Sequence, residues 1–356
     1  MRDLTSLFVR LHTSIRDTMA QIDANRQGIA LIVDGQQRLL NTITDGDIRR
    51  AILGGVGLDE RVETVVRDKK HPLYEKPVSA MLGTKNDELL RRMRAHNIRQ
   101  LPLLNEEGVV GDLVTLSDLV SEVDLPLRAV VMAGGFGTRL RPLTEDLPKP
   151  MLPVGDKPLM EHIIGGLRDA GIGHVNVTTH FKADKIREHF GDGSQFGVNI
   201  EYTAEDEPLG TAGALGLLDE SSEQMLVING DILTAVDFRS LLSFHREHKA
   251  SLTVGVRKYD LEVPYGVVRT NNGLVEKVDE KPVYTFFVNA GIYLLEPLAR
   301  RLIPRGKPMD MTDLIDRLLD EGHTVASYPI VEYWLDIGRQ ADYEKAQEDL
   351  RNGRVS

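Results

Sequence analysis

The sequence predicts an α/β protein with a doubly wound, mixed and mainly parallel sheet, preceded by a smaller α+β region. Short apolar runs alternate with amphipathic stretches over residues 127–352, which is the pattern of a doubly wound sheet. A glycine-rich loop follows the first of these runs, and an internal repeat occupies the first 124 residues. Each of these features carries candidate site residues.

The composition is that of a globular protein with two domains. The chain has 356 residues, of which 41% are hydrophobic and 27% charged, enough for two domains with a sizeable core. The net charge of −11 argues against nucleic acid or an anionic membrane as the main partner. The absence of cysteine excludes disulfides and thiolate chemistry. No stretch resembles a signal peptide or a membrane span, so we expect a cytoplasmic protein.

The repeat consists of two copies of a strand, a turn, a strand and a helix. Thr44 and Thr115 lie 71 residues apart, as do Asp47 and Asp118, and a fixed period of this kind marks a duplicated unit. The Thr-x-x-Asp pattern after each second strand resembles that of a tandem pair of cystathionine-β-synthase (CBS) domains. The second copy keeps the glycine of the pattern at Gly111, and the first copy does not.

The CBS resemblance implies a regulatory or dimerisation module over residues 1–124 and a homo-oligomer. It also implies an adenine-nucleotide site at Thr44, Asp47, Thr115 and Asp118, since carboxylates accept ribose hydroxyls and helix starts favour phosphate. The alternative is that each Thr–Asp pair only caps the helix that follows it. Pro126, after a short linker, marks the predicted end of this region.

The glycine-rich loop of residues 133–138 follows an apolar strand at residues 129–132. Exposed backbone N–H groups at such a turn grip phosphate, and Arg139 and Lys149 add two cations. A Walker A loop is excluded because Thr138-Arg139 follows Gly137. A dinucleotide fingerprint is excluded because its third glycine position is Leu140. A tight turn without a ligand is the remaining alternative.

Two motifs here, G-G-x-G-T-R-L-x-P-L-T and K-P-M-L-P-V, resemble the signature of nucleoside-diphosphate-sugar pyrophosphorylases, also called sugar-1-phosphate nucleotidyltransferases. The resemblance covers residues 127–349 and implies the Rossmann-like fold of that family. It implies attack of a sugar-1-phosphate on the α-phosphate of an NTP, with release of pyrophosphate. The implied catalytic cations are Arg139 and Lys149. The implied nucleotide contacts in the loop are Ala133, Gly134, Gly135, Gly137 and Thr138.

The family's base-binding loop resembles the stretch around Gly210 and Thr211, and the position that reads the base edge is Glu205. A carboxylate only accepts hydrogen bonds, so it suits guanine, which presents two donors, N1–H and N2–H₂. Cytosine's amino group also satisfies a carboxylate, which leaves CTP as an alternative. The sequence therefore favours GTP. A solvated acidic loop without a ligand is the other interpretation.

Asp231 ends the apolar strand at residues 225–228, and Asp336 lies in the motif W-L-D-I-G. Mg²⁺ prefers hard oxygen ligands and takes one or two carboxylates together with substrate phosphates. Both motifs resemble the metal-binding elements of the family, so the resemblance implies that Asp231 and Asp336 hold Mg²⁺. Either residue alone would also fit a strand-end cap.

The sugar side is implied by the Glu-Lys-Pro motif at residues 280–282. On this resemblance Lys281 neutralises the sugar phosphate and belongs to the catalytic set. Phe286 and Phe287 are expected in the core. Sugar contacts are expected from Gly266, Glu280 and Asn289.

The order of a CBS pair and a transferase with a base-reading Glu resembles that of sugar-1-phosphate guanylyltransferases of bacterial surface-glycan synthesis. The resemblance implies a GDP-sugar made from glucosamine-, heptose- or mannose-1-phosphate. The sugar-phosphate oxygen is itself the nucleophile, so catalysis depends on positioning and charge. The alternatives are a cytidylyl- or other-base transferase, a catalytically silent nucleotide sensor and a dimerisation scaffold.

Overall fold

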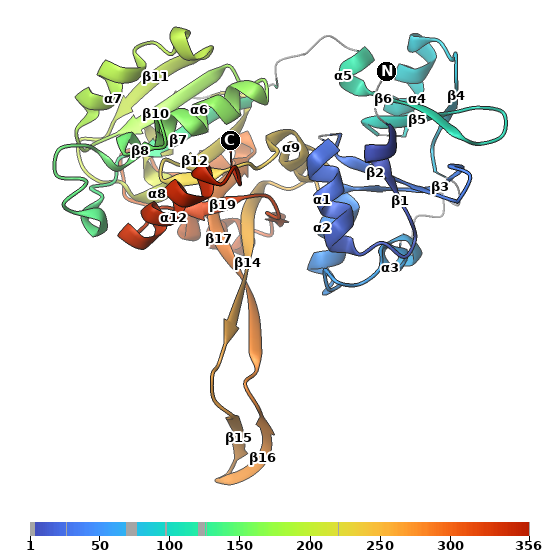
Figure 1. Cartoon of the computed structure of the whole chain (residues 1–356). Helices are drawn as coiled ribbons and strands as arrows, with labels where there is room; N and C mark the ends of the chain where they lie inside the picture. Colours follow the sequence, from blue (N-terminus) through green and yellow to red (C-terminus); the bar gives the residue numbers. More distant parts are fainter. Residues whose placement is uncertain are drawn as a thin grey trace. The chain divides into compact units, whose positions relative to one another are not determined.

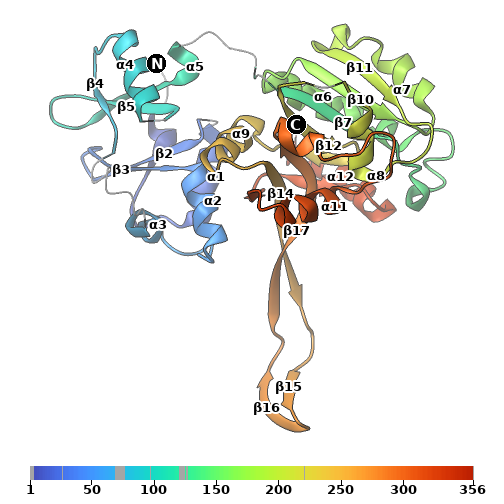
Figure 2. The ribbon, with the colours of Figure 1, turned by 180° about the vertical axis from the view of Figure 1, so that it is seen from behind.

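The computed structural model describes residues 4–25, 27–68, 77–96, 98–119, 125, 127–219 and 221–355. The chain forms two compact units, Met1–Val123 and Asp124–Ser356, traced from opposite sides in Figure 1 and Figure 2. Pro126 and all of the predicted linker except Leu125 lie outside the described residues. Across the described residues, no helix combines the length and the apolar character needed to cross a membrane.

The first unit repeats one arrangement twice. In each copy a short strand pairs parallel to a central strand, which forms an antiparallel hairpin with the next strand. The first copy contains β1 (Phe8–Val9), α1 (Ile15–Asn25), β2 (Ile29–Val33), β3 (Leu39–Thr44), α2 (Asp45–Leu53) and α3 (Val62–Asp68). The second contains β4 (Ala80–Met81), α4 (Asn86–Ala95), β5 (Gln100–Leu104), β6 (Val110–Thr115) and α5 (Leu116–Leu119).

The second unit is built on a seven-stranded sheet, of which one strand, β17, runs antiparallel to its neighbours. The predicted mixed, mainly parallel sheet is therefore confirmed. In spatial order the strands are β11 (Asn199–Ala204), β10 (His174–Thr179), β7 (Leu127–Ala133), β12 (Gln224–Asn229), β17 (Val283–Leu295), β14 (Leu252–Glu262) and β18 (Val325–Pro329).

Helices cover both faces of this sheet because its strands are apolar on both sides. Along β7, Ala129 and Val131 belong to one buried cluster and Val130 to the other. The first cluster includes residues from α6 (Leu159–Asp169), α7 (Ala183–Phe190) and α9 (Phe238–Glu247). The second includes residues from α10 (Pro297–Arg301) and α11 (Met311–Asp320).

The order in which strands are added to the sheet reverses beside β7. From β7 the chain adds β10 and β11 on one side and then returns to place β12 on the other. Ligands of doubly wound sheets bind beyond the carboxyl ends of the strands at such a reversal. The two loops that flank it follow Ala133 and Asn229, and these are the loops that carry the predicted phosphate and metal residues.

Strands β14 and β17 continue beyond the sheet as a two-stranded ribbon, tipped by β15 (Val267–Asn271) and β16 (Leu274–Asp279). Figure 1 shows this ribbon projecting from the sheet, and we call residues 257–288 the arm. The expectation that Phe286 and Phe287 lie in the core is wrong. Their side chains are 50% and 41% exposed, because they lie on the part of β17 that has left the sheet.

Candidate functional site

The loop after β7 has a conformation that glycine makes accessible. Gly137 has a φ of 62°, and a Cβ there would lie 2.9 Å from Thr144 Cγ2, so both the backbone and the space favour glycine. Thr144 Oγ1 donates to the Gly137 carbonyl at 2.8 Å. A Cβ on Gly135 would meet no atom within 4 Å, so the middle of the loop faces open space.

A short antiparallel ladder brings the two predicted metal carboxylates together. Strands β13 (Ile232–Thr234) and β19 (Trp334–Asp336) pair so that Ile232 faces Asp336. The Ile337 N–H donates to the Asp231 carbonyl at 3.0 Å. Gly230 N–H donates to Met132 O at 2.9 Å, which fixes this ladder beside the end of β7.

Lys149 and Arg139 complete this cluster. Lys149 is 8% exposed, and its Nζ lies 2.5 Å from Asp231 Oδ2 and 3.9 Å from Asp336 Oδ1. A Cβ on Gly338 would lie 3.5 Å from Asp336 Oδ1 and 3.7 Å from Arg139 Nη1, so both groups border the same glycine. The structure therefore gathers four predicted residues at the reversal point of the sheet, two cations and two carboxylates.

The two carboxylates fit a divalent cation. The Oδ1 atoms of Asp231 and Asp336 are buried and have no hydrogen-bond partner. Burial and the Asp231 charge raise the pKa of Asp336, while Lys149 and Arg139 oppose that rise. Unsatisfied hard oxygens at this place suit Mg²⁺. Within the described residues, no group of three or more metal-ligating side chains forms, so the remaining ligands would come from water and substrate phosphates.

Glu205 follows β11 directly and is 8% exposed. Its Oε2 accepts the Leu209 N–H at 3.1 Å, and a Cβ on Gly134 would lie 2.7 Å from its Oε1. Burial raises the pKa of Glu205, and the Leu209 N–H and His180 oppose this effect. The predicted base-reading carboxylate thus lies against the phosphate loop, with Gly134 leaving room for it.

Gly210 and Thr211 contact residues 309–311, which the sequence analysis did not predict. Thr211 N–H donates to Asp310 Oδ1 at 3.0 Å, and Thr211 Oγ1 accepts the Met311 N–H at 2.8 Å. Gly210 has a φ of 76°, and a Cβ there would lie 2.7 Å from Met309 O. These contacts tie the predicted base loop to the start of α11, 99 residues away.

The predicted sugar-side residues are divided. Asn289 lies where β17 leaves the sheet, and its side chain bonds Tyr293 OH and the Gly291 N–H. Gly266, Glu280 and Lys281 lie in the arm instead. A Cβ on Gly266 would lie 3.0 Å from Glu280 Oε2, so these two adjoin. The arm that carries these three residues extends away from the sheet (Figure 1).

Comparison with known proteins identifies the two units. Residues 128–353 match the nucleotidyl transferase family, and residues 2–54 and 74–124 match the CBS domain. The chain belongs to the nucleotidyl transferase family. The predicted combination of this family with a CBS pair is confirmed.

Curated relatives are similar to about three fifths of the chain. A mannose-1-phosphate guanylyltransferase of Mycobacterium tuberculosis is 36% identical over 63% of this chain and 65% of its own length. A mannose-1-phosphate guanyltransferase of Schizosaccharomyces pombe is 34% identical over 61% of this chain and 62% of its own length. The chain thus spans less than two thirds of the length of these relatives.

Solved structures are similar to a comparable share of the chain. HddC from Yersinia pseudotuberculosis, solved in complex with GMP-PN, is 27% identical, with a TM-score of 0.50 over 63% of this chain and 99% of its own. A chain from Bacillus anthracis described as a glucose-1-phosphate thymidylyltransferase is 26% identical, with a TM-score of 0.53 over 64% of this chain and 96% of its own.

In the CBS pair, both Thr–Asp motifs make the same capping contacts. Asp47 Oδ2 accepts the Thr44 N–H at 2.9 Å, and Thr44 Oγ1 accepts the Asp47 N–H at 3.2 Å. Asp118 Oδ2 accepts the Thr115 N–H at 2.7 Å, and Thr115 Oγ1 accepts the Asp118 N–H at 3.3 Å. These contacts are those expected of helix caps. Adenine-nucleotide binding at these residues stays a prediction.

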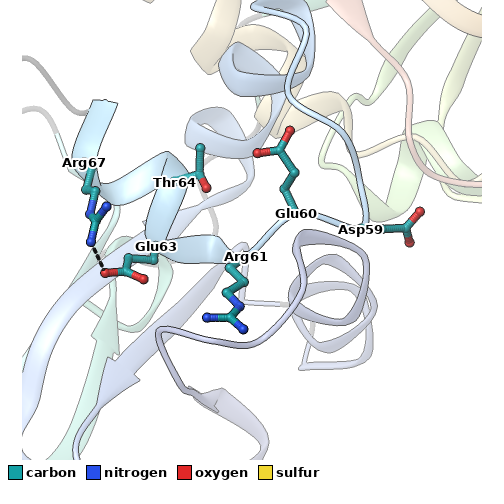
Figure 3. A pocket seen from close by; sticks show the side chains of 6 residues that line it. All are labelled: Asp59, Glu60, Arg61, Glu63, Thr64 and Arg67. Carbon is teal, nitrogen blue, oxygen red and sulfur yellow. Dashed lines mark hydrogen bonds and ion pairs between the residues drawn. The ribbon is translucent and has the colours of Figure 1, made fainter.

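The CBS pair also has an open pocket of about 290 Å³, drawn in Figure 3. The pocket is lined by two cationic side chains, Arg61 and Arg67. Arg67 pairs with Glu63 at 2.6 Å. None of the predicted nucleotide residues lines this pocket, and we assign it no function. Its lining residues are Asp59, Glu60, Arg61, Glu63, Thr64 and Arg67.

Proposed function

We propose that the chain is a sugar-1-phosphate guanylyltransferase, which makes a GDP-sugar and pyrophosphate from GTP and a sugar-1-phosphate. One observation carries the proposal: the cluster of Arg139, Lys149, Asp231 and Asp336 at the reversal point of the sheet, where a nucleotide binds in this type of fold. Glu205, buried against the adjoining loop, and the guanylyl specificity in the names of two relatives support GTP.

The mechanism needs no protein nucleophile. A phosphate oxygen of the sugar-1-phosphate attacks the α-phosphorus of the NTP, and the bond from that phosphorus to pyrophosphate breaks. Backbone N–H groups of the loop from Gly134 to Gly137 hold the triphosphate. Arg139 stabilises the leaving pyrophosphate, and Lys149 offsets charge at the α-phosphate. Mg²⁺ held by Asp231 and Asp336 supplies further charge neutralisation when bound.

The test is pyrophosphate release with Mg²⁺, crossing the four NTPs against mannose-, glucosamine-, glucose- and heptose-1-phosphate. Release with GTP and one sugar phosphate is expected. Mannose-1-phosphate is the first sugar phosphate to test, because the names of the two relatives above contain it. Release with CTP or UTP alone would overturn the choice of base. No release in any combination would favour the catalytically silent nucleotide sensor.

Glu205→Gln tests the base assignment. An amide loses one acceptor, so kcat/KM for GTP is expected to fall about 10- to 100-fold, with a smaller change for UTP. Because burial raises the pKa of Glu205, protonation weakens GTP binding as the pH falls toward that raised pKa. KM for GTP in the wild type should therefore rise as the pH is lowered below neutral, while KM in Glu205→Gln stays flat. An equal pH response in both proteins would contradict the assignment.

The CBS pair is proposed to regulate the enzyme or hold a homo-oligomer together. The matching contacts at Thr44 and Thr115 show that the two copies repeat the same local structure after their second strands. A rise in the melting temperature with AMP or ATP that is lost in Asp47→Asn and Asp118→Asn would support a nucleotide site there. An unchanged melting temperature would leave the Thr–Asp pairs with their capping role alone.

A further inference from the structure

The arm leaves the sheet at the edge where the carboxylate cluster lies. Val256 is the last residue of β14 that pairs with β18, and it faces Asn289 on β17. A Cβ on Gly291 would lie 2.6 Å from Asn229 Nδ2, and Asn229 is two residues before Asp231. From Arg257 to Glu262 the ribbon pairs without a register shift, and Figure 2 shows it extended away from the sheet.

One face of the arm is apolar, and the other mixes polar and apolar residues, since Phe287 faces Lys258 and Val283 faces Glu262. Residues directly opposite in an antiparallel pair share a face. Tyr259 faces Phe286 and Leu261 faces Tyr284, which makes one face continuously apolar. On the other face Asp260 accepts the Thr285 hydroxyl at 2.6 Å and pairs with Lys258 at 3.2 Å.

The same division continues at the tip of the arm. Val268 faces Val278 on one side, and both are more than half exposed. On the other side Arg269 and Lys277 both pair with Asp279. An amphipathic ribbon of this length is built to cover an apolar surface, because a ribbon with an exposed apolar face is marginal in water.

Exposed apolar side chains concentrate in the arm. In the described part of the chain, 17 large hydrophobic residues are exposed, and ten of them lie between residues 259 and 287. These side chains lie on both faces of the ribbon, because consecutive strand residues such as Phe286 and Phe287 point to opposite faces. So much exposed apolar surface in one segment marks an interaction surface. The ten are Tyr259, Leu261, Tyr265, Val268, Leu274, Val275, Val278, Val283, Phe286 and Phe287.

Two charged residues of the arm, Glu280 and Lys281, indicate what the arm binds. The family resemblance assigns Glu280 and Lys281 to the sugar side of the site, and Lys281 is held at a φ of 44°, a conformation that costs energy in a non-glycine residue. The carboxylate cluster of the same chain lacks these groups. The arm therefore carries the residues expected at the sugar phosphate away from the sheet that holds Asp231 and Asp336.

We propose that the arm inserts into the active site of a second copy of this chain, where Glu280 and Lys281 complete the sugar-phosphate side. The inference rests on the proposed function. Because each copy both gives and receives an arm, the assembly closes as a two-fold dimer. Each active site then contains Lys149, Asp231 and Asp336 from one chain and the Glu-Lys pair from the other.

Complementation between two inactive variants tests this directly. Asp231→Asn removes a group from the sheet side of the site, and the double variant Glu280→Gln, Lys281→Met removes the arm groups with little change of shape. Each variant alone should be inactive. Co-expressed, they form mixed dimers in which one site is intact, so the mixture should reach about one quarter of wild-type activity.

The matched control pairs Asp231→Asn with Lys149→Met. Both changes lie on the sheet side, so every site in a mixed dimer carries one of them and no activity should return. A folded but inactive mixture of the arm and sheet-side variants, with an active wild type, would overturn the exchange and show that each arm serves its own chain.

A second readout is independent of activity and uses the absence of cysteine from the chain. One tagged chain carries Tyr265→Cys at the arm, and a second carries Phe136→Cys at the phosphate loop. Both native side chains are exposed. A short bis-maleimide should link the two chains to one another, whereas Leu319→Cys, exposed on α11, should not link to the arm.

The two readouts separate the two hypotheses. If the wild type releases no pyrophosphate with any substrate, the proposed function fails, and the cross-link still decides where the arm binds. If the wild type is active and no cross-link forms between different chains, the arm exchange fails and the proposed function stands.

Discussion

Lys149→Met is expected to lose turnover and stability together. Lys149 is the cation between Asp231 and Asp336, with a side chain only 10% exposed. Its removal leaves two facing carboxylates without their shared partner. Breaking a largely buried ion pair costs about 2–4 kcal/mol after allowance for the partial exposure of Asp231. Turnover should fall about 10²- to 10³-fold, because a charge positioned for the transition state is lost.

Thermal unfolding and pyrophosphate release measure the two effects, with Lys157→Met as the matched control. Lys157 is exposed on the short strand β9 (Lys157–Pro158), so its loss should change neither. Mg²⁺ should restore part of the stability of Lys149→Met, because a cation between the carboxylates replaces the lost charge. A melting temperature equal to that of the wild type would mean that the Lys149 ion pair does not hold the site together.

The sequence was enough to predict the sheet and the glycine-rich loop after its first strand, because both depend on local patterns. The apolar run at Ala129 and its neighbours, followed by glycines, predicts a buried strand and a turn from adjacent residues alone. The turn at Asn272 and Gly273 is equally local: their φ values of 48° and 83° are those that an Asn-Gly hairpin turn requires.

Contacts between distant residues were not predictable from local patterns. The pairing of Ile232 with Asp336 depends on a ladder between segments about a hundred residues apart, and the resemblance to a family, not the residues themselves, nominated Asp336. No motif in the sequence pointed to Asp310. Its role at Thr211 appears only when α11 is in place.

The arm shows a different limit. Alternating apolar residues predict a strand with one covered face, but not which surface covers it. Phe286 has the pattern of a core residue and lies on an exposed ribbon. The expectation that Phe286 lies in the core was therefore wrong, because the part of β17 that carries it has left the sheet.

Asp336→Asn is expected to separate activity from stability. The side chain is a predicted metal ligand, so turnover should fall about 10²- to 10³-fold. Stability should change in the opposite direction, because burial and the neighbouring charge of Asp231 raise the pKa of Asp336. A carboxyl group with a raised pKa in the folded state costs stability once the pH exceeds its unfolded value, and the cost grows until the pH passes the folded value.

An amide at this position removes that cost, so the metal-free melting temperature should rise above that of the wild type at neutral pH. The rise should be small, about 1–2 °C, because the side chain is 46% exposed and water screens its charge. Asp316→Asn, exposed on α11, is the control and should leave both quantities unchanged. Mg²⁺ should stabilise the wild type more than Asp336→Asn. Equal stabilisation of both proteins by Mg²⁺ would show that Asp336 is not a ligand.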